Sequence, residues 1–294
     1  MNIQANAKIN LTLDIIGKRP DGYHDLVMVM QSVGLHDDVE VNLNDSGKIT
    51  VRSSSAALKD DESNIAYKAA KAFFAYSGIE GQGVDITIEK NIPMEAGMAG
   101  GSADGAAVIV ALNELCGTGW PDEELWEIGV TVGADVPFCI TGGTMLAEGK
   151  GEILTPLPAL ADFPHPPVIL LCKPEVGVST GQAYAAVDHC DPDTLALFRP
   201  NTDAMKRALA EQDLLGVTDY LENVFERVLP IDECSEIKRT MLVFGALGAC
   251  MTGSGTTVFG IFDSAEKADQ CAAFLKKTFA KTYITGAERE GCVL

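Results

Sequence analysis

Apolar and polar side chains alternate along the start of the chain, from residue 3 to residue 15. A period of two is typical of a strand with one face in the core. The apolar positions are Ile3, Ala5, Ala7, Ile9, Leu11, Leu13 and Ile15. We therefore predict a strand over about 2–16 that places Lys8, Asn10 and Asp14 on one polar face. The structural interpretation of that face is a half-solvated strand, whose outer side chains are normally polar.

The rest of the first half alternates predicted strands and helices, and the second half is mostly helical. Strands are expected over about 39–43, 48–53, 83–90, 168–172, 256–262 and 282–285, and helices over about 64–77, 102–116 and 122–132. Five of the 13 prolines fall between Pro156 and Pro167, a stretch that cannot hold a regular helix. The pattern predicts an α+β protein with two domains, 1–155 and 156–294.

One uncharged stretch, Leu242 to Phe262, has the 21 residues that a membrane span needs. The polar run Thr252–Thr257 interrupts its middle, so we interpret it as a helix end, a turn and a strand. The start of the chain has no continuous apolar segment, because Asn6, Lys8 and Asn10 interrupt it, and no cleavage signature. We therefore expect a cytosolic protein without a membrane partner.

Charge narrows the possible partners further. The chain has 42 acidic residues against 22 Lys and Arg, a net charge of −20. Nucleic acids are bound by clustered cations, so we expect no nucleic-acid partner. An anionic small molecule would need local cations and backbone amides to reverse the sign of this field. The 8 cysteines contain no C-x-x-C pair, so the spacing of a metal or redox motif is absent.

A glycine-rich segment, residues 93–107, joins a predicted strand to an apolar helix. Gly97, Gly100 and Gly101 allow the backbone to approach a ligand closely, and Ser102 is expected to cap a helix whose free amides face an anion. This order predicts a phosphate cradle; the structural alternative is an ordinary flexible connection. The sequence contains no G-x-x-x-x-G-K-[ST], no complete G-x-G-x-x-G, and none of the H-R-D, D-F-G or G-x-S-x-G signatures.

Two further loops could hold a ligand. Residues 17–24 form a turn-rich loop with two cations and two rings, which suits an anionic ligand with a flat base. Residues 251–257 form a second glycine turn, which could close over phosphates or simply join two elements. Both alternatives stay open for the second loop at this point.

Asp135 lies at a predicted bend in the segment 133–138. Gly133 is expected to end a helix, and Pro137 is expected to hold Val136 in an extended conformation. An aspartate in a turn is often structural, because its carboxylate accepts hydrogen bonds from nearby amides. The structural and the catalytic interpretations of Asp135 therefore both remain.

Four motifs, taken in order, resemble the GHMP small-molecule kinases. They are A-K-I-N-L-T-L, P-M-E-A-G-M-A-G-G-S-A-D-G-A-A, G-A-D-V-P-F and M-T-G-S-G-T-T-V-F-G. Two more, G-K-R-P-D-G-Y-H and V-G-V-S-T-G-Q-A-Y, are similar to those of the 4-diphosphocytidyl-2-C-methyl-D-erythritol kinases of the non-mevalonate isoprenoid route. The resemblance spans the whole chain. It implies a ribosomal-protein-S5-like N-terminal domain, a ferredoxin-like C-terminal domain and an active site between them.

The resemblance also implies a reaction, in which ATP, with Mg²⁺, donates its γ-phosphoryl group to the tertiary 2-hydroxyl of a cytidine-diphosphate-linked methylerythritol. Lys8 and Asp135 would be the catalytic pair. Asp135 would accept the hydroxyl proton or orient the attacking oxygen, and Lys8 would keep it ionised and stabilise developing charge. The ATP phosphates would lie against Pro93, Met94, Glu95, Ala96, Gly97, Met98, Ala99, Gly100, Gly101, Ser102 and Ala103.

Four residues would bind the substrate in this scheme. Asn10 would orient its hydroxyl, Tyr23 and Tyr184 would stack on cytosine, and His24 would read the hydrogen-bonding edge of the base. Tyr184 has a structural alternative, because the capping box Ser179-x-x-Gln182 places it in the second turn of a helix, where it could be a core residue.

Two positions depart from the family loop. Ala103 replaces the second serine of G-G-S-S-D, and Glu95 stands where a small or neutral residue is usual. The protein ligand of the metal is therefore open, since Glu95 could face away from the triphosphate or meet Mg²⁺.

Three other functions compete with this one. A GHMP kinase for mevalonate, homoserine or a sugar would share the glycine loop but not the cytidine motifs. A silent nucleotide-binding regulator could lose the base, whereas Lys8 and Asp135 are both retained here. A structural α+β protein would make four ordered motifs a coincidence. Nothing in the sequence indicates the oligomeric state.

Overall fold

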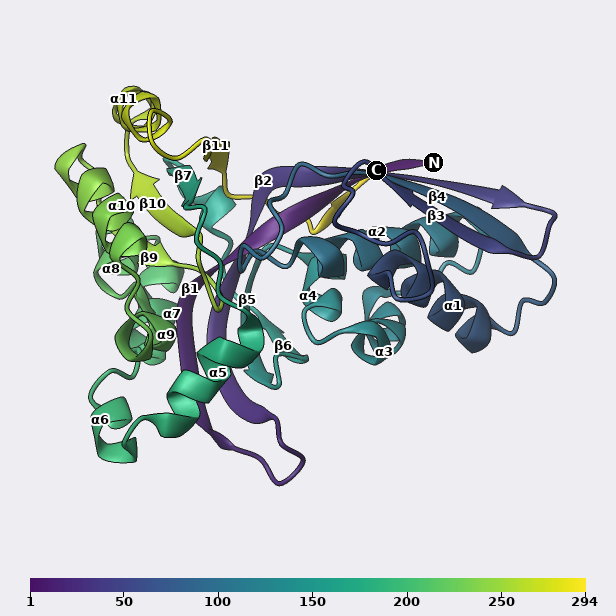
Figure 1. Cartoon of the computed structure of the whole chain (residues 1–294), viewed down its shortest axis with the longest axis horizontal. Helices are drawn as coiled ribbons and strands as arrows, with labels where there is room; N and C mark the ends of the chain where they lie inside the picture. The colour runs from purple at the N-terminus through teal and green to yellow at the C-terminus, as the bar shows by residue number, and fades with distance from the viewer.

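Two long antiparallel strands, β1 (Asn2–Lys18) and β2 (His24–Asn44), form the centre of the molecule. The computed structural model describes residues 1–294, apart from the side chain of residue 192. Four strands extend the sheet from one edge of β2: β3 (Ile49–Ser53), β4 (Gly83–Glu89), β5 (Thr144–Gly149) and β6 (Ile153–Pro156). Four helices lie together on one side of it (Figure 1): α1 (Ile65–Ser77), α2 (Gly100–Leu115), α3 (Asp122–Val132) and α4 (Val136–Thr141).

The second half builds a separate four-stranded antiparallel sheet with the order β11-β7-β10-β9. Its strands are β7 (Val168–Lys173), β9 (Gly248–Met251), β10 (Val258–Phe262) and β11 (Lys281–Gly286). Two helices pack on this sheet, α10 (Asp232–Val243) and α11 (Ala265–Leu275). The connections hold η1 (Leu160–Asp162), α5 (Thr180–His189), α6 (Pro192–Ala196), α7 (Thr202–Ala210), α8 (Leu214–Asp219) and α9 (Val224–Val228). The predicted α+β class is confirmed.

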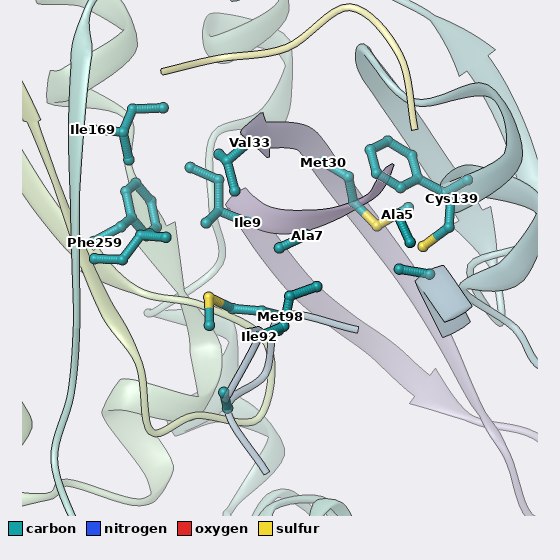
Figure 2. Packing of buried hydrophobic residues seen from close by; sticks show 14 of the residues in the cluster. Ala5, Ala7, Ile9, Met30, Val33, Ile92, Met98, Cys139, Ile169 and Phe259 are labelled. Atoms are coloured by element: carbon teal, nitrogen blue, oxygen red, sulfur yellow. The ribbon is translucent and has the colours of Figure 1, made fainter. Parts of the chain in front are cut away.

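Two short strands from the second half join the first sheet. β12 (Cys292–Val293) pairs with Gln4 and Ala5, and β8 (Glu222–Asn223) pairs with Thr12 and Leu13, both on β1. The apolar core is also continuous across β1, and Figure 2 shows Ile9 close to Phe259 of the second sheet. The division at residue 156 stays a prediction, but each half of the chain contributes to the packing of the other.

The uncharged stretch from Leu242 to Phe262 divides as the sequence predicts into a helix end, a turn and a strand, with β9 as an additional strand before the turn. Among the described helices, none has the length and apolar character required to cross a membrane.

Candidate active site

A cleft of about 530 Å³ lies between the two halves of the molecule. Its walls come from β1, the glycine loop 93–102, the start of α4, and the segments 178–184 and 253–255. Five separate sequence motifs therefore meet at one cavity.

The polar face of β1 is buried around Lys8, Asn10 and Thr12, which are at most 4% exposed. The half-solvated strand expected from the alternation is therefore wrong, because the second half of the chain covers this face. A register shift between Asn10 and Thr12 marks a β-bulge, which reverses the alternation beyond it. Leu13 then lines the cleft, while Asp14 points to Arg199, 3.5 Å away. Asp14 is therefore separate from the cleft-facing side chains.

Lys8 and Asp135 meet in the floor of the cleft. The Lys8 Nζ donates a hydrogen bond to Asn10 Oδ1 at 2.7 Å and lies 4.0 Å from Asp135 Oδ2. The Lys8 side chain is 5% exposed, and that of Asp135 is 32% exposed. A buried ammonium beside a cleft-facing carboxylate supplies both a cation for developing charge and a group that can accept a proton.

Asp135 reaches the cleft because a helix begins directly after it. Gly133 ends α3, as predicted, and Asp135 is the N-cap residue of α4. The expectation that Pro137 holds Val136 extended is wrong: Val136 opens the helix, since a proline in the first turn needs no N–H donor. No side-chain capping bond forms from Asp135 within the described residues. A purely structural role for Asp135 would require its carboxylate to accept hydrogen bonds from nearby amides, and no such capping bond forms among the described residues.

The outer edge of β1 is occupied by two loops between β12 and β8. The backbone N–H of Lys8 donates to the carbonyl of Met98 in the glycine loop, at 3.2 Å. The N–H of Asn10 donates to Thr252 Oγ1 at 3.0 Å, and Asn10 Oδ1 accepts from the N–H of Gly253 at 3.0 Å. The strand that carries Lys8 thus fixes both glycine-rich segments. The sequence showed these segments only as separate loops.

The glycine loop presents the start of α2 to the cleft. Ala99, in the left-handed conformation with φ +58°, is the N-cap residue and forms no side-chain cap. The expected capping role of Ser102 is therefore wrong, because the helix begins at Gly100 and Ser102 already lies in its first turn. The amides of Gly100, Gly101 and Ser102 have no backbone acceptor among the described residues. Such a helix start is a ready anion site.

Gly97 and Gly101 are required for packing at this point. A Cβ on Gly97, which has φ +71°, would lie 2.2 Å from the carbonyl oxygen of Thr252. A Cβ on Gly101 would lie 3.1 Å from Ile65 Cδ1 in α1. Gly97 therefore lets the glycine loop touch the 252–255 turn, and Gly101 lets α2 touch α1.

Three buried ionisable side chains, those of Asp37, Lys90 and Asp104, support the glycine loop. Lys90 Nζ donates to Asp104 Oδ2 at 2.7 Å and to a carboxylate oxygen of Asp37. Asp37 also accepts the N–H groups of Asn91 and Ile92, at 2.6 and 2.8 Å. Burial raises the pKa of Asp104 to about 8, and its Oδ1 has no hydrogen-bond partner among the described residues. Asp37 and Lys90 carried no signal in the sequence, because nothing local marks two charges that pair 53 residues apart.

The far end of the cleft is aromatic. Ser179 and Gln182 form the predicted capping box at the start of α5, and Tyr184 lines the cleft. The ring of His24 stacks on Tyr184, with centroids 4.8 Å apart, and Phe225 meets Tyr184 edge-on at 5.2 Å. Burial raises the pKa of the Tyr184 hydroxyl to about 12. The structure thus brings His24 and Tyr184 into direct contact.

Tyr23 lies apart from this stack and is 60% exposed. Lys150 approaches it, with Nζ 4.3 Å from the ring centroid, and also lies 3.0 Å from Asp21. Lys150 also lines the cleft, and no sequence motif identified it. The only local sequence signal for Lys150 was its position between Gly149 and Gly151 in a hairpin turn.

The two-part α+β fold with a cleft between its halves is that of the GHMP small-molecule kinases. Residues 64–143 match the GHMP kinases N terminal domain, and residues 195–281 match the GHMP kinases C terminal domain. A 4-diphosphocytidyl-2-C-methyl-D-erythritol kinase of Clostridium acetobutylicum is 41% identical over 97% of this chain and 99% of its own. The chain belongs to the family of these kinases.

Solved structures agree with this assignment. A crystal structure of 4-(cytidine 5'-diphospho)-2C-methyl-D-erythritol kinase is 31% identical, with a TM-score of 0.78, covering 98% of this chain and 99% of that one. The homoserine kinase of Cytophaga hutchinsonii has a TM-score of 0.82 at 21% identity, covering 100% and 96%. The second likeness concerns the fold alone.

Proposed function

We propose that this chain transfers the γ-phosphoryl group of ATP to the 2-hydroxyl of 4-diphosphocytidyl-2-C-methyl-D-erythritol. The observation that carries the proposal is the arrangement of one cleft. The open start of α2, the aromatic side chains of Tyr184 and Phe225, and the Lys8–Asp135 pair all line it. The names of relatives at 41% identity support the same substrate.

The phosphates of ATP would lie at the start of α2, against the free amides of Gly100, Gly101 and Ser102. Lys8 would contribute a buried cation at the reacting end. These groups reverse locally the repulsion that a net charge of −20 imposes on an anion.

Phosphoryl transfer asks the protein mainly to position the reactants and to stabilise charge. Asp135 would orient the substrate hydroxyl or accept its proton, and Lys8 would stabilise negative charge on the transferred group. The oxygen of Asn10 is already used by Lys8 and Gly253, while its amide nitrogen meets only Met28 Sδ at 3.4 Å. Because Asn10 is fully buried, it would orient the substrate hydroxyl through Lys8, whose ammonium it holds.

Mg²⁺ would reach the cleft with ATP. The oxygen groups available near the phosphates are the Ser102 hydroxyl and the carboxylates of Asp135 and Glu95, which all line the cleft. No group of three His, Cys, Asp or Glu side chains within the described residues could hold a metal ion. This set fits an Mg²⁺ that keeps phosphates and waters as most of its ligands and takes one or two from the protein. The ion would neutralise phosphate charge.

The aromatic end would bind the cytosine. Tyr184 would stack on the base, His24 would read its edge, and Tyr23, beside Lys150, would cover the other face after moving from its exposed position.

The experiment is a substrate panel. The protein is incubated with ATP, Mg²⁺ and, in turn, the cytidine-linked alcohol, the same alcohol carrying only a phosphate, mevalonate and homoserine, and ADP release is followed. Only the cytidine-linked compound should turn over well, and CMP or CDP should compete with it but not with ATP. Equal rates with the phosphate-only alcohol would contradict the proposed substrate.

A further inference from the structure

We propose that Asp188 is a specificity-determining positioning residue: it fixes the proton of His24 on Nε2 and thereby makes the cleft prefer cytosine to uracil. The inference rests on the proposed function, since it concerns the base that the aromatic end would bind. It adds a residue that no sequence motif identified.

The contacts of Asp188 define its chemistry. Its Oδ1 lies 2.8 Å from His24 Nε2, and its Oδ2 accepts a hydrogen bond from Lys18 at 2.5 Å. These two hydrogen bonds lower the pKa of Asp188. The ionised carboxylate can only accept hydrogen bonds, so Nε2 of His24 must carry the hydrogen between the two residues.

A neutral imidazole has one N–H, so a proton held on Nε2 leaves Nδ1 as an acceptor. No hydrogen bond to Nδ1 of His24 forms among the described residues. The ring itself is held in place, because it is 9% exposed and stacks on Tyr184. Tyr184 and Asp188 are four residues apart on α5, so one face of this helix supplies both the stacking ring and the orienting carboxylate.

Cytosine and uracil differ at the edge that such an acceptor would meet. Cytosine carries a 4-amino group, which donates, whereas uracil carries a 4-carbonyl oxygen, which accepts. A fixed Nδ1 acceptor can accept a hydrogen bond from the 4-amino group of cytosine. With uracil, the lone pair of Nδ1 would face a lone pair of the 4-carbonyl oxygen, and neither group could donate. Polar sites of this kind reject the mismatched ligand strongly, and we expect a preference of about 10- to 100-fold.

The test compares the cytidine and uridine diphosphate forms of the same alcohol. In the wild type, kcat/KM should favour the cytidine form. In Asp188→Asn, the amide can donate to Nε2 and allow the proton to move to Nδ1, so the preference should fall towards one. The change should appear in the KM for the pyrimidine substrate, with kcat and the KM for ATP unaltered. Asp203→Asn, the same exchange at a side chain that is 87% exposed, should keep the full preference.

A second measurement does not depend on turnover. Nitrogen-15 chemical shifts of the His24 ring should report an Nε2–H tautomer in the wild type and a mixture in Asp188→Asn. A variant that keeps both the tautomer and the full base preference would overturn the inference, as would an Nδ1–H tautomer in the wild type. Absence of turnover with either pyrimidine form would contradict the proposed function, while the ring shifts would still decide the role of Asp188.

Discussion

At the scale of single residues, the position of Asp135 is the most informative. Its carboxylate stands at the start of a helix without capping it, and it lies 4.0 Å from a buried ammonium. A negative charge at the start of a helix costs little folding free energy, because the helix dipole favours negative charge there. It is therefore free to act on a ligand.

Replacement of this carboxylate should separate chemistry from binding. Asp135→Asn keeps the shape of the side chain and removes its charge, so we expect kcat to fall by about 10²-fold or more, with ATP affinity little changed. Steady-state kinetics and calorimetric titration with ATP measure the two effects. Turnover close to that of the wild type in the folded variant would show that Asp135 is not catalytic.

Site residues could be predicted from the sequence only where they belong to a recognisable motif. Lys8, Asn10 and Asp135 stand in such motifs, and the structure brings all three together. Lys150 and Asp188 could not be found in this way, because each acts through a partner more than 100 residues away. No local pattern records a contact of that length.

At the scale of elements, the glycine loop and the 252–255 turn depend on each other. Gly97→Ala would place a Cβ against the carbonyl of Thr252, so the loop must shift and we expect ATP affinity to fall about tenfold or more. Gly117 is a matched control, since its φ is +65° and a Cβ there meets nothing within 4 Å. Gly117→Ala should cost about 1 kcal/mol of stability and leave ATP binding unchanged. Calorimetry with both variants checks this, and equal ATP affinities would contradict the contact.

The buried triad below the loop joins β2, the end of β4 and α2, and it should make stability depend on pH. The pKa of Asp104 is raised from 3.8 to about 8, so between these values the folded chain holds a proton that the unfolded chain releases. Its contribution to stability is complete below about pH 4 and is lost as pH rises through 8. Lys90, whose pKa is raised from 10.5, loses its contribution only at higher pH.

In the Asp104→Asn variant, the amide that replaces this carboxyl group does not titrate. Between pH 6 and pH 9, the free energy of unfolding of the wild type should therefore fall by about 1 to 3 kcal/mol relative to the variant. Urea denaturation of both proteins at several pH values measures the difference. Parallel pH curves for the two proteins would mean that Asp104 is ionised throughout this range.

The elements that could be predicted well are those with local start and stop signals. Asn64 and Gly78 cap α1, and Gly133 ends α3, so both helices agree with their predicted ranges. The first part of β2 was missed, because residues 28–33 are buried without alternation of apolar and polar side chains. β5 depends on pairing with β2, and β6 depends on pairing with β5, rather than on a pattern of their own.

At the scale of the whole molecule, the two halves are interlocked through β1. β8 and β12 both pair with this strand, and the second half covers its polar face. We therefore expect the full chain to unfold in one cooperative transition. A fragment of residues 1–155 lacks both partner strands and should show no cooperative unfolding. Thermal denaturation followed by near-UV circular dichroism tests this, and two separate transitions would show that the halves fold independently.

The loops on the outer edge of β1 have one more consequence. Between β12 and β8, the amides of Lys8 and Asn10 are satisfied by Met98 and Thr252 instead of by a neighbouring strand. An uncovered strand edge is a template for pairing with another chain, and such pairing leads to aggregation. The glycine loop, which would bind the phosphates, therefore also covers the edge of β1 and hinders aggregation. A nucleotide that holds this segment in place would protect the protein from precipitation as well as supply the group that it transfers.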